Sequence, residues 1–229
     1  MNIKKMLGFL LVFIINKNLN AEQITILYLN DTFENYNSIE NEKKEKFGGI
    51  AAVSTKIKQI RKEVDHLILL NSGNITKSTD DEKTVELDLK LMSKLKFDAI
   101  AIGFNYISSD VSKIYKKLKI KKLPFISCNI FKKDQLFPAF NKYIVKKFGN
   151  ARIAIIGLSS DEIAKSDNNF ESNDSLINFK KCVELLKKNV GQDLTIILSN
   201  FTNKNNKNTF FESIKDMKNT ILIDSNASM

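Results

Sequence analysis

The chain has 229 residues, of which 43% are hydrophobic, so it can form one or at most two folded domains and is not a disordered chain. Its net charge of +10 comes from 36 basic residues, of which only Arg61 and Arg152 are arginine, and 26 acidic residues. The lysines are spread along the expected helix faces between Glu and Asp, whereas nucleic-acid readers use arginine and clustered aromatics. We therefore expect no nucleic-acid partner.

The N-terminus has the pattern of a secretory signal. Two lysines precede the apolar run Met6 to Ile15, which is shorter than the roughly 20 residues that a membrane-spanning helix needs. Ala21 ends an imperfect small-residue cleavage site. We expect residues 1–21 to be a signal peptide and residues 22–229 to be the exported protein, periplasmic or extracellular. A retained membrane anchor is the alternative.

After this segment, short apolar runs alternate with longer amphipathic segments, which is typical of an α/β sheet protein with one domain. The expected strands lie at Ile24–Leu29, Leu67–Leu70, Ala99–Ile102, Phe125–Ser127, Tyr143–Val145, Ile153–Ile156, Leu194–Leu198 and Thr220–Ile223. The expected helices run from Gly48-Gly49 to about Glu63, and over Val85–Leu95, Val111–Leu118, Leu176–Val190 and Phe210–Ile214.

Two polar stretches are expected to be loops, one from about Asn30 to Lys46 and the other from Thr202 to Asn208. Phe148-Gly149-Asn150 predicts a hairpin turn between two strands.

The two cysteines leave two alternatives. Cys128 follows an expected strand and Cys182 lies within an expected helix, so they form either one disulfide or two buried free thiols. The single histidine, His66, begins an expected strand, and we expect it to be a packing or surface residue.

Polar residues collect directly after the expected strands, at the edge where open α/β sheets bind their ligands. These segments are Asn30-Asp31-Thr32-Phe33, Asn71-Ser72-Gly73-Asn74, Gly103-Phe104-Asn105-Tyr106, Ser199-Asn200-Phe201 and Asp224-Ser225-Asn226-Ala227-Ser228.

In order and spacing these segments resemble the signature blocks of the 5′-nucleotidase branch of the calcineurin-like metallophosphoesterases: N-D-x-H, D-x-G-D, G-N-H-E, S-H and G-H-x-H. Similar segments between the blocks extend the resemblance over almost the whole mature chain: Gly48–Glu63, Leu89–Gly103, Leu123–Phe131 and Arg152–Ser160. The resemblance implies an α/β fold, a metallophosphoesterase-like sandwich of mixed β-sheets flanked by helices. It also implies two divalent metals, bridged by one Asp, that activate a water for attack on phosphorus.

This chain departs from the family pattern at almost every ligand, and only Asp31 matches. Phe33 stands where the family has a His, and Asn74 stands where it has the bridging Asp. Phe104 and Asn105 occupy the places of the Asn and the catalytic His. Asn200 replaces a further His, and Asn226 and Ser228 replace the pair of His in the last block. A shift of the loop by one residue would let Asn105 serve as the Asn ligand. A binuclear site needs anionic and imidazole ligands, so we expect no metal cofactor and no catalytic residues here.

The sequence therefore predicts an exported, non-catalytic 5′-nucleotidase-like protein with a binding or scaffold role. Its expected partner is a protein of unknown identity, and association with a membrane complex stays open. The alternative is a residual metal-dependent phosphohydrolase acting on nucleotides or other phosphoesters. The chain stops at Met229, directly after the last block, so we expect it to lack the family's C-terminal nucleotide-binding domain. We expect Phe33 and Phe104 to fill the volume that metals and histidines would occupy.

Export predicts removal of the first 21 residues, because the apolar run is short, close to the start and followed by Ala21. Mass spectrometry of the protein isolated from its own cells should find Glu22 at the N-terminus. An intact Met1 would reject cleavage.

Overall fold

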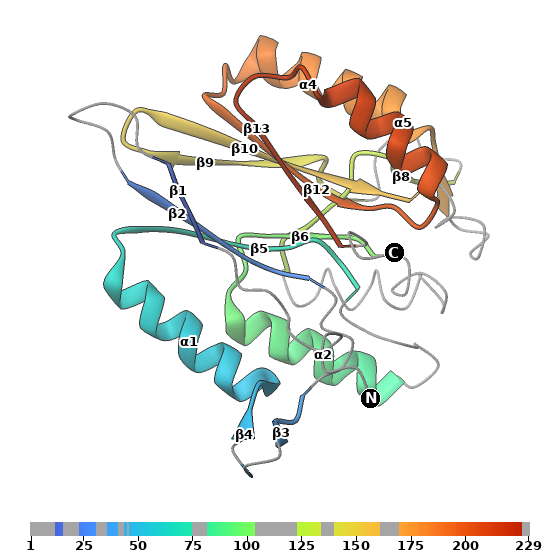
Figure 1. Ribbon diagram of the computed structural model, residues 1–229. Coiled ribbons are helices and arrows are strands. Elements are labelled where there is room, and N and C mark those ends of the chain that lie inside the picture. Colours follow the sequence, from blue (N-terminus) through green and yellow to red (C-terminus); the bar gives the residue numbers. More distant parts are fainter. Residues whose placement is uncertain are drawn as a thin grey trace.

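The computed structural model describes residues 12–15, 23–30, 36–40, 44, 46–74, 82–103, 123–133, 140–160 and 170–225. The protein is a sandwich of two β-sheets with helices on both outer faces (Figure 1). The predicted metallophosphoesterase-like sandwich is confirmed.

The first sheet has five strands in the order β1-β2-β5-β6-β7. β2, β5, β6 and β7 run parallel, and β1 is antiparallel to β2. The bounds are β1 Val12–Ile15, β2 Ile24–Leu29, β5 His66–Asn71, β6 Ala99–Ala101 and β7 Phe125–Ile126. Helices α1 (Gly49–Glu63) and α2 (Glu82–Leu95) cover its outer face.

The second sheet has the order β13-β12-β10-β9. β10, β12 and β13 run parallel, and β9 forms the predicted antiparallel hairpin with β10. The bounds are β9 Tyr143–Phe148, β10 Ala151–Ser159, β12 Leu194–Asn200 and β13 Thr220–Asp224. Helices α4 (Ser175–Asn189) and α5 (Lys204–Ile214) cover its outer face.

Two short two-stranded sheets complete the structure. One pairs β3 (Ile39–Glu40) with β4 (Lys46–Phe47), and the other pairs β8 (Ile130–Lys132) with β11 (Phe170–Ser172). The sequence analysis did not predict either pair. β3 and the start of β4 lie in the stretch that was expected to be a loop, because segments of two or three residues carry too little periodicity to be recognised.

Three apolar layers hold the sandwich together. Alternate residues of each strand face opposite sides of its sheet, so Ile26 packs between the two sheets while Leu27 packs against α1 and α2. Ile155 likewise faces the first sheet, and Ile156 faces α4 and α5. Because both faces of the central strands are buried, these strands are almost continuously apolar, which is why the sequence revealed them.

The backbones of the two sheets are in direct contact between β10 and the end of β7. A Cβ on Gly157 would collide with the carbonyl group of Ile126, and the Gly157 carbonyl accepts a hydrogen bond of 2.8 Å from the Cys128 amide. Only glycine leaves room for this contact between backbones.

The predicted helices and strands within the described residues are present, and Val111–Leu118 lies outside these residues. One loop prediction is wrong: α5 begins at Lys204, inside the stretch Thr202–Asn208. The Asn203 side chain caps the helix, because its oxygen accepts hydrogen bonds from the amides of Asn205 (2.9 Å) and Asn206 (3.3 Å).

The predicted signal peptide contains β1, which the structure pairs with β2. Cleavage before Glu22 would remove this edge strand and leave β2 at the edge of the sheet, so the cleavage site stays a prediction. In the described part of the chain, every helix is too short or too polar to cross a bilayer.

Both cysteines are buried free thiols, the second of the two alternatives. Cys128 and Cys182 lie in the layer beneath α4 and α5. Burial raises the pKa of the Cys182 thiol to about 12, although the charge of Lys142 acts in the opposite direction. The neutral thiol is therefore the form that the folded protein favours.

A thiol reagent at pH 8 should consequently find no reactive cysteine in the native protein and two in the protein unfolded by urea, as a colorimetric titration would measure. The folded state should also lose stability as pH rises above the unfolded cysteine pKa of about 8.5, because the unfolded chain gives up the Cys182 proton first. Two unreactive thiols in the unfolded, unreduced protein would instead demonstrate a disulfide.

Candidate functional site

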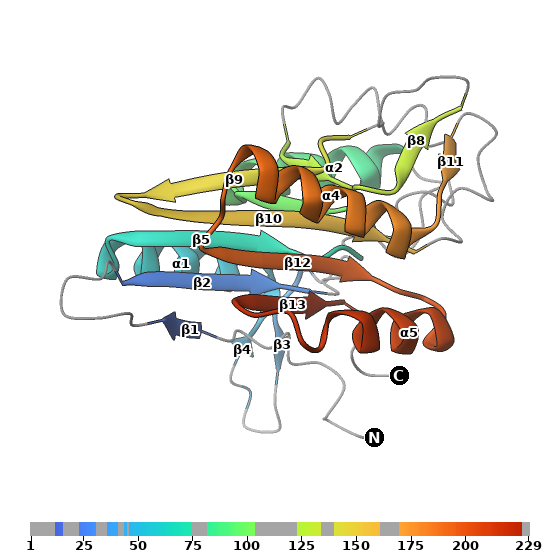
Figure 2. The same cartoon turned by 90° about the horizontal axis from the view of Figure 1, so that it is seen from above.

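The carboxyl ends of the parallel strands of both sheets lie on one side of the sandwich, as the direction of β2, β5, β12 and β13 in Figure 2 shows. Asn74 follows β5, Asn200 ends β12, and Ser225 follows β13. Each of these three residues is buried, with at most 4% of its surface exposed.

A serine hydroxyl joins the two predicted asparagines. Ser225 Oγ accepts a hydrogen bond from Asn200 Nδ2 and another, of 3.5 Å, from Asn74 Nδ2. Asn74 belongs to the first sheet, whereas Asn200 and Ser225 belong to the second. The contact therefore closes the sandwich at this edge.

A second link between the sheets runs through Asn30, the residue that follows β2. Asn30 Nδ2 donates to the backbone carbonyl of Asp224 at 3.3 Å, and Asn30 Oδ1 accepts a 2.6 Å hydrogen bond from Ser72 Oγ. The ends of β2, β5 and β13 are thus joined through one amide.

The Asp224 carboxylate is balanced inside the protein. One carboxylate oxygen accepts a hydrogen bond of 2.6 Å from Ser199 Oγ and another of 3.5 Å from the Phe201 amide. The other lies 2.6 Å from Lys207 Nζ on α5, and the Asp224 and Lys207 side chains are only 4% and 15% exposed, respectively. The buried negative charge of Asp224 is therefore already neutralised by a lysine.

Two glycines allow the Asn74 loop to take its shape. A Cβ on Gly103 would collide with the Asn74 amide nitrogen, and one on Gly73 would lie 3.0 Å from the Gly103 Cα. Gly73 has a φ of 112°, which favours glycine, and its amide donates to Asn71 Oδ1 at 2.8 Å. This backbone contact holds Asn74 toward the second sheet.

The structure thus brings together Asn74 and Asn200 of the predicted site. The other predicted positions lie outside the described residues: Asp31, Phe33, Phe104, Asn105, Asn226 and Ser228. His66 lies at the opposite end of β5, roughly 16 Å from Asn71 at the strand's rise per residue, and its ring stacks on Phe148 at 5.0 Å between centroids. The prediction that His66 is a packing or surface residue agrees with this position.

The sequence analysis missed four of the contributors described above, Asn30, Lys207, Asp224 and Ser225. Asn30 and Ser225 stood in the strand-end segments, and their direct adjacency to β2 and β13 was the available signal. Lys207 gave no signal, because it was assigned to a loop and its contact with Asp224 depends on where α5 packs.

The described donors at this edge do not fit a pair of divalent metals. Among the described residues they are neutral amides and hydroxyls, together with the Asp224 carboxylate, which is paired with Lys207. Within the described ranges, no three His, Cys, Asp or Glu side chains are close enough to hold a metal ion. A binuclear centre requires anionic and imidazole ligands, which these residues do not supply.

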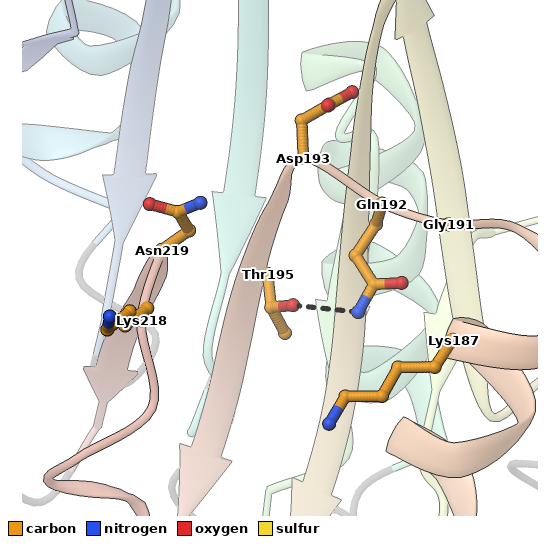
Figure 3. Close-up of a pocket in the computed structure, with 7 residues that line it drawn as sticks. All are labelled: Lys187, Gly191, Gln192, Asp193, Thr195, Lys218 and Asn219. Carbon is orange, nitrogen blue, oxygen red and sulfur yellow. Dashed lines mark hydrogen bonds between the residues drawn. The ribbon is translucent and has the colours of Figure 1, made fainter.

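A separate hollow lies at the other end of the second sheet, where β12 and β13 begin (Figure 3). Its walls include Gln192, which donates to Thr195 Oγ1 at 3.3 Å, and the side chains of Lys187 and Lys218. Its volume of about 230 Å³ is below the roughly 300–1,000 Å³ of small-molecule sites. We therefore assign it no ligand.

Comparison with known sequences identifies relatives of one kind, although no family model matches the chain. Protein UshA of Yersinia enterocolitica is 30% identical over 184 residues, which are 76% of this chain and 33% of that protein. The 5′-nucleotidase of Vibrio cholerae is 29% identical over 188 residues, 77% of this chain and 33% of that protein. The chain thus spans about one third of the length of these relatives.

Solved structures give the same result. The 5′-nucleotidase precursor of Thermus thermophilus has a TM-score of 0.67 at 22% identity, covering 78% of this chain and 37% of that one. The NAD nucleotidase of Haemophilus influenzae has a TM-score of 0.71 at 20% identity, covering 89% and 38%. This chain is a 5′-nucleotidase homologue with the calcineurin-like phosphoesterase fold.

Within this 5′-nucleotidase homologue, Asn74 and Asn200 stand at two positions where the resemblance implied an Asp and a His. The two side chains meet across the two sheets at Ser225, and their assignment to a former metal site stays a prediction.

Ser225→Ala should destabilise the protein, because it removes the acceptor shared by two buried amides. An unsatisfied buried donor costs about 1–3 kcal/mol, and each kcal/mol lowers the Tm of a domain of this size by about 2–4 °C. Thermal melting would measure the loss. The control is Ser93→Ala, an exposed serine that donates to the Lys90 carbonyl, which should change stability by less than about 0.5 kcal/mol. Equal melting of both variants would show that the Ser225 contacts carry no stability.

Proposed function

We propose that this 5′-nucleotidase homologue is non-catalytic and works outside the cytoplasm as a binding or scaffold protein. The similar proteins are named Protein UshA and 5′-nucleotidase, and this chain spans about one third of their length.

The observation that carries the proposal is the bonding at the strand ends. Asn74 and Asn200 donate to Ser225, and Lys207 neutralises Asp224. The resemblance implies that a phosphoesterase of this fold holds its metal ions at the positions of Asn74 and Asn200. Here the side chains bond to one another instead.

The position of the single histidine supports the same proposal. The imidazole nitrogen of histidine is a metal ligand that an amide or a hydroxyl replaces poorly. The sequence contains one histidine, and it lies at the opposite end of β5 against Phe148. Rearrangement of the strand-end loops would not bring it to Asn74.

The proposal of export rests on the N-terminal pattern alone: two lysines, a short apolar run and Ala21. An exported scaffold would meet its partner at its outer surface, because Asn74 and Asn200 are buried.

The competing function is residual metal-dependent hydrolysis of a phosphoester, for which Asp31 is the remaining family carboxylate in the sequence. The two functions differ in what the purified chain binds and releases, so one preparation distinguishes them.

The purified chain should contain no stoichiometric divalent metal by elemental analysis. It should release no phosphate from AMP above the blank when manganese or zinc is added. The 5′-nucleotidase of Vibrio cholerae, assayed in the same buffers, is the positive control. Phosphate release that disappears in Asp31→Ala would overturn the proposal and establish the hydrolase.

A further inference from the structure

One face of α4 combines exposed apolar and basic side chains. Ile177 is 51% exposed and Leu185 is 39% exposed, and they are two of the three large apolar side chains exposed in the described part of the protein. The two residues are eight apart, so they lie on one face of the helix, with Lys181 between them and Lys188 on the next turn.

The charge of this face is unbalanced. Its exposed residues include Lys180, Lys181, Lys187 and Lys188 but only one acid, Glu184. None of these lysines is in an ion pair within the described ranges, whereas on α2 Lys90 lies 3.2 Å from Glu86. The helix therefore presents uncompensated positive charge to its surroundings.

Lys142, just before β9, extends the same patch. With Lys181, Glu184, Leu185 and Lys188 it lines a shallow hollow of about 380 Å³ beside the helix. On its other side, α4 is fixed to the second sheet through Phe179, Cys182 and Leu186, which are buried. The basic and apolar face, defined here as Lys142, Ile177, Lys181, Leu185 and Lys188, is thus presented by a helix that is anchored to the core.

We propose that this face binds the surface of an anionic phospholipid membrane. Each lysine near such a surface is attracted to it without needing a directed hydrogen bond. The long lysine stems lie along apolar surface while their ammonium groups reach the phosphates, and Ile177 and Leu185 contact the acyl boundary.

The composition of the face favours lipid over an acidic protein. Protein interfaces are enriched in aromatic residues and arginine and are depleted in lysine. Apart from Glu184, which lines the same hollow, the residues of the basic and apolar face are lysines and aliphatic residues. This proposal does not depend on whether the strand-end site is catalytic.

The test is co-sedimentation of the full chain with vesicles of equimolar phosphatidylglycerol and phosphatidylcholine, against vesicles of phosphatidylcholine alone. The parent should bind the anionic vesicles and release them at high salt, because the attraction is screened. Lys181→Glu/Lys188→Glu should weaken binding by about 25-fold, since each lysine contributes about fivefold. The apolar run Met6 to Ile15 affects every variant and both kinds of vesicle equally.

The matched control is Lys58→Glu/Lys62→Glu on α1. These two exposed lysines are four residues apart and their replacement changes the net charge equally, but α1 covers the opposite outer face (Figure 1). Retained binding in this control, with loss in the α4 variant and unchanged melting of both, supports the proposal.

Three results would overturn the proposal. Equal loss in the two variants would mean that only the net charge matters. No preference of the parent for phosphatidylglycerol would exclude an anionic membrane. Capture of the parent on immobilised polyglutamate, without binding to vesicles, would assign the face to an acidic protein.

Discussion

The two consecutive residues Asp224 and Ser225 fasten the two halves of the sandwich at its strand-end edge. The backbone carbonyl of Asp224 accepts a hydrogen bond from Asn30. Its carboxylate accepts a hydrogen bond from Ser199 and forms an ion pair with Lys207. Ser225 accepts from Asn74 and Asn200. The apolar layer between the sheets is non-directional, whereas these bonds fix which strand ends face each other. A buried ion pair contributes little net stability by itself. Removing either Asp224 or Lys207 would nevertheless destabilise the fold, because the other would remain as an unpaired buried charge.

This bonding holds the described strand ends of a phosphoesterase fold together through neutral side chains. Two dications in such an edge require several anions to balance them, and the anions repel one another when the metals leave. Neutral amides have no such repulsion, and each supplies both donors and an acceptor. Asn74 and Asn200 can therefore lie close together around one hydroxyl. The single carboxylate that remains at this edge among the described residues, Asp224, has its cation supplied by α5 in the form of Lys207.

The fold was largely predictable because burial on both faces makes strands such as Ile24–Leu29 continuously apolar, and β2 has these bounds. The strand-end segments also gave Asn74 and Asn200, since parallel strands end at one edge. What the sequence could not supply was the pairing between them. The role of Ser225 depends on the pairing of β13 with β12. The role of Lys207 depends on the start of α5 at Lys204. There the Asn203 side chain, which accepts hydrogen bonds from the amides of Asn205 and Asn206, begins a helix in spite of the loop-like composition of the Asn/Lys stretch.

The strand-end edge and the outer helices differ in how their polar groups are paired. Polar side chains at the edge bond to one another, whereas those on the outer face of α4 are exposed to solvent. Asn74, Asn200 and Ser225 are at most 4% exposed and bond to one another, so a partner approaching that edge would have to break existing hydrogen bonds. The outer face of α4 has no such cost, because its lysines have no ion pairs within the described ranges and Ile177 and Leu185 already contact water. A partner gains the most free energy where it contacts exposed charges and apolar side chains, since no hydrogen bond within the protein has to be broken there. In this homologue that surface is the outer face of α4, and recognition is therefore expected at this helix face.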